Sequence, residues 1–337
     1  MLKFLDEKEE AEFSREGYFV RRIFDSVEVE KLRSEFNKHF PEEVLIPNAH
    51  TNYYTALDSR ADRLRLITDW SSKAWSASLN DLFDGWQEIQ PSVIVKPANG
   101  GPTAIHNHVP ATDRPFSINI TGWSPLIDCD EGNGCLYLVP NSQHLLRHID
   151  TGFAGYLSDS AIGERIRVNH SVAVPLKAGE AVFFESSMFH GAFPNQSNTR
   201  RIAIATLIAC QTERVAIYSK DKGAILALPL LDLNYAQSYA VRHVVSQEAG
   251  AVLREFPDWT KTPNYAQVDA LLRSKGPRAR EDYDPLDTVR HLQAPTMDPP
   301  MPRAVKSQSW GIRHAIGRIP GARRVYRSIK ALSGRHP

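Results

Sequence analysis

Residues 178–195 read AGEAVFFESSMFHGAFPN, which is a turn, a strand and a second turn that ends on a histidine. The turn at 178–180 leads into an apolar run at 181–184. A short apolar run between turn residues indicates a buried β-strand. The segment then places His190 at the end of this strand. Because imidazole nitrogen binds iron, zinc and copper, the stretch predicts a strand end with a potential metal ligand.

Short apolar and β-branched runs of the same kind recur on both sides of this stretch. They lie at 93–95, 117–121, 136–139, 172–174 and 202–209. Clusters of Gly, Pro, Asn and Asp separate them. Many short strands with such turns are typical of an all-β sandwich or barrel. The central part of the chain is therefore expected to be mainly β.

Helical patterns flank these strands. Residues 6–16 and 60–84 read as helices, and Asp25 and Ser26 are N-cap candidates for a helix to about Phe40. A helical pattern returns at 222–274, and the segment 276–303, rich in Pro, Asp and Arg, is predicted to wrap the surface. The expected organisation is a helical region packed on the core at 1–85, the catalytic core at 86–215, a helical or irregular extension at 216–298 and a basic amphipathic tail at 299–337.

Composition excludes several classes of protein. The three cysteines, Cys129, Cys135 and Cys210, form no Cys-x-x-Cys pair, so we expect buried thiols and neither a disulfide framework nor a thiolate zinc site. The N-terminus turns acidic at once, which does not fit a signal peptide. No apolar run is long enough to span a bilayer, and a cytoplasmic location is expected. The net charge of +1 gives no indication of a polyanionic partner.

Two more histidines precede the central strands in a pattern that suits a metal. His106 and His108 follow a Gly-Gly-Pro turn, and residues i and i+2 of a strand point to the same side. With His190 they would form a facial set of three ligands. The plainer interpretation is that they belong with the other histidines, twelve in all, at the surface or in a hydrogen-bonded core. Arg201, eleven residues after His190, opens a strand where a guanidinium can bind a carboxylate in a bidentate manner.

Over about residues 9–210 the chain resembles the phytanoyl-CoA dioxygenase-like family of Fe(II)- and 2-oxoglutarate-dependent oxygenases. The matching motifs, in chain order, are the opening at 13–20 with a helix from near Asp25, the strand Val93-Ile94-Val95-Lys96-Pro97, the His106-Asn107-His108 triplet, Trp123-Ser124-Pro125-Leu126, the acidic turn and Asn-Gly-Cys-Leu at 128–136, Val139-Pro140-Asn141-Ser142-Gln143-His144, the turn at 178–180, His190-Gly191 with Pro194-Asn195, and Arg201.

The resemblance implies a double-stranded β-helix (jelly-roll, cupin-like) core with flanking helices. It implies Fe(II) as cofactor and 2-oxoglutarate as cosubstrate. The implied metal ligands are His106, His190 and, in the carboxylate position, His108. Arg201 would bind the far carboxylate of 2-oxoglutarate, and the candidates to line the same pocket are Lys96, Asn119 and Trp123. The implied reaction with O₂ hydroxylates an aliphatic carbon of a small or lipid-like molecule.

The sequence departs from the family at the second ligand. The family has His-x-Asp where this chain has His106-Asn107-His108, so three neutral imidazoles would replace a set with one negative charge. Four outcomes stay open. In the first, His108 is an iron ligand in an enzyme that uses 2-oxoglutarate, and in the second it is an iron ligand in a dioxygenase that needs no 2-oxoglutarate. In the third, the His108 side chain points away from the iron and leaves a coordination position for chloride. In the fourth, the site binds no iron and the protein is catalytically silent. Asp113 is the nearest spare carboxylate, and it matches a non-ligand acid of the family motif.

The C-terminal segment is strongly basic. Residues 299–337 contain nine Lys or Arg and no acidic residue, and Val325, Ile329 and Leu332 share a helical face. This pattern predicts either an interfacial helix on anionic lipid or a tail packed on the protein body or a partner subunit. Nucleic acid is not expected, since no recognition motif accompanies the charge. The sequence indicates no oligomeric state.

Overall fold

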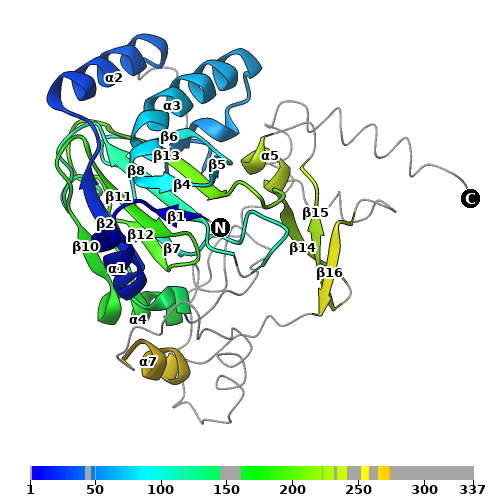
Figure 1. Cartoon of the computed structure of the whole chain (residues 1–337). Coiled ribbons are helices and arrows are strands. Elements are labelled where there is room, and N and C mark those ends of the chain that lie inside the picture. The colour runs from blue at the N-terminus through cyan, green and yellow to red at the C-terminus, as the bar shows by residue number, and fades with distance from the viewer. Residues whose placement is uncertain are drawn as a thin grey trace, which may run out of the picture.

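Two antiparallel sheets face each other in the computed structural model, which describes residues 2–41, 47–49, 51–115, 117–144, 161–221, 223–230, 234–240, 252–257 and 265–273 (Figure 1). Among these residues the larger sheet has seven strands and the smaller has four. Side chains from both sheets, such as Trp123, Val182 and Leu138, form one apolar cluster between them. The core is a double-stranded β-helix, and the predicted fold class is confirmed.

The strands pair with neighbours that are distant in sequence. The larger sheet runs in the order β2 (Tyr18–Arg22), β11 (Glu180–Glu185), β8 (Ile120–Pro125), β13 (Arg201–Cys210), β6 (Ser92–Lys96) and β3 (Tyr53–Tyr54), with β5 (Trp86–Glu88) also on β13. The smaller sheet runs in the order β10 (Val172–Val174), β9 (Leu136–Leu138), β12 (His190–Ala192) and β7 (Thr103–His106). A short pair joins β1 (Lys3–Phe4) to β4 (Phe83–Asp84).

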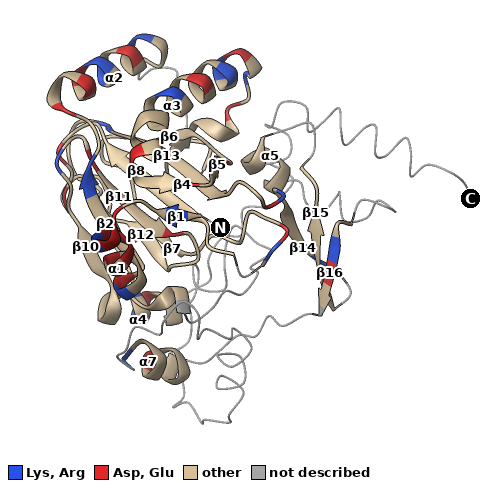
Figure 2. Ribbon diagram, viewed as in Figure 1, with Lys and Arg blue, Asp and Glu red and all other residues tan. Residues whose placement is uncertain are grey.

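Helices cover the outer face of the larger sheet. They include α1 (Glu7–Glu16), α2 (Ser26–His39) and α3 (Ala61–Leu82), and Figure 1 shows α2 and α3 over one side of the strands. Trp75 and Leu79 of α3 are fully buried against Phe183 of β11 in the largest apolar cluster. The predicted N-cap is confirmed, because the Asp25 carboxylate accepts from the Val27 and Glu28 amides. Charged residues are frequent on these helices, and the barrel strands carry fewer, among them Arg21 and Arg22 of β2 (Figure 2).

The region after the barrel differs from the prediction. A helical pattern was expected over 222–274, but the described part forms a three-stranded sheet of β14 (Ile217–Asp221), β15 (Ala224–Leu228) and β16 (Arg254–Pro257). The prediction was wrong there because successive residues of β14 and β15 pack alternately into two apolar clusters, one on each face of the sheet. This packing outweighs the weak helical periodicity of the sequence. Two short helices, α5 (Tyr235–Ala240) and α7 (Tyr265–Arg273), are present.

Smaller differences concern boundaries. The strand expected at 117–121 begins at Ile120, and the short β3 extends the sheet into the region predicted as N-terminal and helical. The helix α4 (Ala161–His170) packs with α7 beneath the smaller sheet, and the remaining elements are the 3₁₀ turns η2 (Thr55–Leu57) and η3 (Ser142–His144). The three cysteines are free and buried, as expected.

The basic tail at 299–337 and the segment at 276–303 lie outside the described residues. The predictions made for them therefore stay predictions. Within the described part of the chain, no helix combines the length and the apolar character that crossing a membrane requires.

Gly191 shows why a glycine follows the histidine of β12. A Cβ built at this position would lie 2.2 Å from the Tyr137 hydroxyl oxygen and 2.6 Å from the Thr103 carbonyl oxygen. We predict that Gly191→Ala lowers the free energy of unfolding by about 1–3 kcal/mol, because the two strands beside it must move apart. Denaturant titration measures the loss.

A matched control is Gly223→Asn. Gly223 has a φ of +85° and no heavy atom within 4 Å of its built Cβ, and asparagine tolerates this conformation. Its free energy of unfolding should stay within about 0.5 kcal/mol of the parent value. Equal losses for the two variants would contradict the steric explanation of Gly191.

Candidate metal centre

Strand pairing places two of the three histidines opposite each other. His106 is the last residue of β7 and His190 the first of β12, and the two are direct Cα partners in the antiparallel ladder. The register then shifts, so that Ala192 pairs with Thr103, and such an irregularity re-aims side chains beside it. Both imidazoles are thereby presented at the same end of the smaller sheet.

His108 reaches the group by a different route from the one predicted. It lies beyond the end of β7, so strand alternation does not explain its direction. Its backbone N–H donates to the Ser186 carbonyl at 2.8 Å, in the turn that leads from β11 to His190. This contact between two loops turns the third imidazole toward the other two.

The three histidines form a compact set of possible metal ligands. One ring nitrogen of each lies within 4.8 Å of those of the others. Ring centroids are 4.2 Å apart for His106 and His190, 4.7 Å for His108 and His190, and 5.4 Å for His106 and His108. The set contains no carboxylate, and Asp113 instead lies 3.4 Å from Arg254 in an ion pair. The group therefore suits a cation that imidazole nitrogen binds.

Hydrogen bonds fix the tautomers of two rings. Nδ1 of His106 lies 2.9 Å from the Ala104 carbonyl oxygen, and Nδ1 of His190 lies 2.8 Å from that of Met188. Since a carbonyl oxygen only accepts, each Nδ1 carries the proton and each Nε2 keeps the lone pair that a metal needs.

Burial keeps the imidazoles of His108 and His190 neutral. It lowers the pKa of His108 to about 3, with a further contribution from His106. It lowers the pKa of His190 well below the ordinary value, and the neighbouring His106 and His108 act in the same direction. Neutral imidazole is the form that binds a metal ion, so these two rings can bind a cation at neutral pH without first losing a proton.

Arg201 is a buried cation without a complete set of partners. It is 1% exposed, and its Nε and Nη1 have no hydrogen-bond partner. Its guanidinium lies 4.9 Å from the centre of the Trp123 ring, and burial lowers its pKa to about 10. A buried charge of this kind is costly unless an anion pairs with it, and a guanidinium edge matches a carboxylate. The arrangement therefore fits a carboxylate ligand such as 2-oxoglutarate.

The other predicted pocket residues fall in different places. Lys96 is the Cα partner of Arg201 and is fully buried, and its Nζ donates to the Gly101 carbonyl at 2.7 Å. Burial, and then the charge of Arg201, lowers the pKa of Lys96 to about 7. Lys96 thus lies beside the guanidinium but already has a backbone partner.

Asn119 does not lie beside Arg201. It precedes Ile120, which pairs with Ile208 near the far end of β13, whereas Arg201 is the first residue of that strand. At about 3.3 Å per residue, the two backbones are separated by more than 20 Å along the sheet. Asn119 Oδ1 accepts from the Ala111 amide at 2.6 Å, which ties it to the loop that follows His108. Its place is therefore the histidine end of the barrel.

Sequence reasoning missed two hydroxyl residues beside His108. Thr121 Oγ1 lies 3.5 Å from His108 Nδ1 and 2.8 Å from Ser186 Oγ. Neither residue stands in a motif that the sequence could reveal, because their proximity depends on the pairing of β8 with β11.

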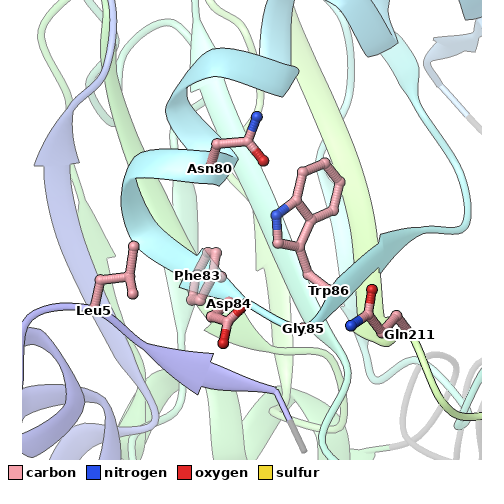
Figure 3. A pocket seen from close by; sticks show the side chains of 7 residues that line it. All are labelled: Leu5, Asn80, Phe83, Asp84, Gly85, Trp86 and Gln211. Carbon is pink, nitrogen blue, oxygen red and sulfur yellow. The ribbon is translucent and has the colours of Figure 1, made fainter.

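A surface hollow is lined by none of the three histidines (Figure 3). It is lined by Leu5, Asn80, Phe83, Asp84, Gly85, Trp86 and Gln211. With one carboxylate and no other ligand type of the kind a transition metal prefers, the hollow is not part of the metal centre.

A family comparison agrees with this geometry. The model of the phytanoyl-CoA dioxygenase (PhyH) family matches residues 13–203, which is more than half of the 337 residues. The chain belongs to this family. The family uses Fe(II) and 2-oxoglutarate, which agrees with the predicted cofactors, and the chain is in general terms an Fe(II)/2-oxoglutarate-dependent enzyme.

Three solved structures illustrate the similarity in fold. The carbocyclase SnoK from nogalamycin biosynthesis is 18% identical, with a TM-score of 0.49 over 74% of this chain and 94% of its own. The epimerase SnoN, solved with Fe³⁺, alpha ketoglutarate and nogalamycin RO, is 21% identical, with a TM-score of 0.46 over 62% and 85%. HygX from Streptomyces hygroscopicus, with nickel and 2-oxoglutarate, is 14% identical, with a TM-score of 0.44 over 61% and 87%. Similarity at this level does not indicate a shared reaction. No curated protein matches the chain by sequence.

Replacing Arg201 should have opposite effects on the stability of the ligand-free protein and on the binding of 2-oxoglutarate. Arg201→Met removes an incompletely paired buried charge and keeps much of the volume, so the ligand-free protein should be as stable as the parent or more stable. The variant should lose the stabilisation that 2-oxoglutarate gives the parent in thermal unfolding, with an apparent affinity at least about tenfold weaker. A variant that is less stable but still stabilised by 2-oxoglutarate would contradict the role of Arg201 as the carboxylate partner.

The pKa of His108 yields a prediction on acidification. In the metal-free unfolded chain His108 takes up a proton below about pH 6.5, whereas in the folded protein it stays neutral to about pH 3. The unfolded state therefore binds more protons in this window, and stability falls as the pH drops from 7 to 5. His108→Gln should reduce this fall in thermal unfolding at the two pH values. An equal fall in both proteins would show that His108 does not contribute.

Proposed function

We propose that the protein is a non-haem oxygenase in which His106, His108 and His190 hold iron(II) and 2-oxoglutarate is the cosubstrate. The main support is the convergence of three imidazoles, with ring nitrogens within 4.8 Å of one another, at one end of a barrel of this family. Bound iron would supply the activation of O₂ for oxidation of a substrate. The chain's own residues bind, orient and enclose the reactants.

Each residue has a distinct part in the proposal. The two tautomers fixed by Ala104 and Met188 present Nε2 of His106 and His190 to the iron. Arg201 binds the far carboxylate of 2-oxoglutarate through the donors that lack partners, and the Trp123 ring holds the guanidinium in place. Lys96 adds positive charge next to Arg201. The apolar cluster between the sheets excludes water from the far end of this pocket.

Charge balance favours a dianionic cosubstrate. Three neutral imidazoles leave the metal its full 2+ charge, whereas the family's carboxylate would cancel one unit. Arg201 adds a further positive charge inside the barrel. A 2-oxoglutarate dianion offsets much of this charge, which would be costly to bury alone.

For the reaction we propose hydroxylation of an aliphatic carbon of a small or lipid-like molecule. The family match supports an oxygenase but names no substrate for this chain. A second candidate is a three-histidine metal or ligand-binding protein that needs no 2-oxoglutarate or is catalytically silent. The lack of a carboxylate in the ligand group favours this second candidate.

Anaerobic titration with Fe(II) and 2-oxoglutarate tests the proposal. We expect the visible charge-transfer band that 2-oxoglutarate gives when it chelates iron(II). His190→Ala and His108→Ala should each abolish the band or weaken iron binding at least about tenfold. His108→Asp restores the family's carboxylate and should keep the band, but with weaker 2-oxoglutarate binding because the added charge repels the dianion.

The outcomes separate the candidates. Absence of the band in the parent protein, with no O₂-dependent formation of succinate, would favour the second candidate. A band lost in His190→Ala but kept in His108→Ala would show that His108 is not a ligand.

A further inference from the structure

His108 is supported differently from the other two histidines. Nδ1 of His106 and of His190 faces a carbonyl oxygen of its own strand or turn, two residues back. Nδ1 of His108 instead faces a side chain, the hydroxyl of Thr121 on β8, at 3.5 Å. The partner of the third imidazole is therefore a side chain, which a substitution can remove while the backbone stays unchanged.

Thr121 and Ser186 form a pair of hydrogen-bonded hydroxyls beside this ring. Their oxygens are 2.8 Å apart, and Ser186 also binds both neighbouring loops through its backbone. Its carbonyl accepts from the His108 amide at 2.8 Å, and its own amide donates to the Asn119 carbonyl at 2.8 Å. His108 is thus connected to β8 and to the turn before His190 at the same time.

We infer that Thr121, supported by Ser186, is the positioning residue that makes His108 the third metal ligand. The inference rests on the proposed function. The Nδ1–H of His108 donates to Thr121 Oγ1, and the Thr121 hydroxyl donates to Ser186 Oγ. With the proton held on Nδ1, Nε2 keeps its lone pair toward the metal, as in His106 and His190.

Burial makes this contact decisive. Thr121 is 8% exposed and Ser186 is 3% exposed, so solvent does not readily replace a lost hydroxyl. Without an acceptor beside Nδ1, the ring gains nothing by placing its proton there, and the tautomer with the proton on Nε2 competes with the metal. The Thr121 hydroxyl thus accepts the Nδ1 proton of His108, as backbone carbonyl oxygens do for His106 and His190.

Co(II) binding to the full chain tests the inference without any substrate. Thr121→Val keeps the shape and the β-branched side chain but removes the hydroxyl. We expect its Co(II) affinity to fall about 10–100-fold, with a changed d–d spectrum because one nitrogen ligand is lost or displaced. Thr121→Ser restores the hydroxyl and should return the affinity to within about threefold of the parent value.

Thr206→Val is the matched control. Thr206 is a buried threonine on the neighbouring strand β13, opposite Gly122, and its hydroxyl donates to Glu88 at 2.6 Å on the face away from the histidines. This variant should lose stability but keep the parent's Co(II) affinity and spectrum. Equal weakening in Thr121→Val and Thr206→Val would overturn the inference, since the effect would then be structural.

The remaining outcomes separate this inference from the proposed function. If His108→Ala weakens Co(II) binding and Thr121→Val does not, only the inference about Thr121 fails. If His108→Ala leaves Co(II) affinity and spectrum unchanged, the third ligand fails and both ideas fall together.

Discussion

The pairing of β7 with β12 is the constraint on which the rest of the site depends. It sets His106 opposite His190, two residues that are 84 positions apart in sequence, and so brings two of the three proposed ligands together. β12 also pairs with β9, and the tight packing of Gly191 against Tyr137 and Thr103 holds the three strands in register. A shift of β12 by one residue in this register would turn His190 to the opposite face and separate it from His106.

The barrel then separates two kinds of polar group along its length. The histidines and the hydroxyl pair of Thr121 and Ser186 lie at one end, while Arg201 and Lys96 are buried farther along β13 and β6. A cation at the histidines, as proposed, and the guanidinium of Arg201 would fit a ligand with a metal-binding end and a distant carboxylate. Two buried positive charges are unfavourable without an anion beside them, so the same feature that would favour ligand binding lowers the stability of the protein alone.

Much of the fold could be predicted from the sequence. The strand runs, the N-cap at Asp25 and the ordered motifs from 13 to 201 led to the double-stranded β-helix and to the family. The sheet of β14, β15 and β16 could not be predicted, because short amphipathic runs are decided by what they pack against. The position of Asn119 at the histidine end of the barrel follows from the strand direction and register of β8, which the sequence alone does not give.

The sequence by itself determined the residue types of the proposed site and their order: His106, His108 and His190 without a carboxylate, and an arginine eleven residues after His190. Local chemistry is sufficient for that, because metal and carboxylate recognition depend on residue type. Only the tertiary structure decided how His108 joins the group. It lies outside its strand, so its direction comes from the Ser186 carbonyl and the Thr121 hydroxyl, two contacts between segments that are brought together by folding alone.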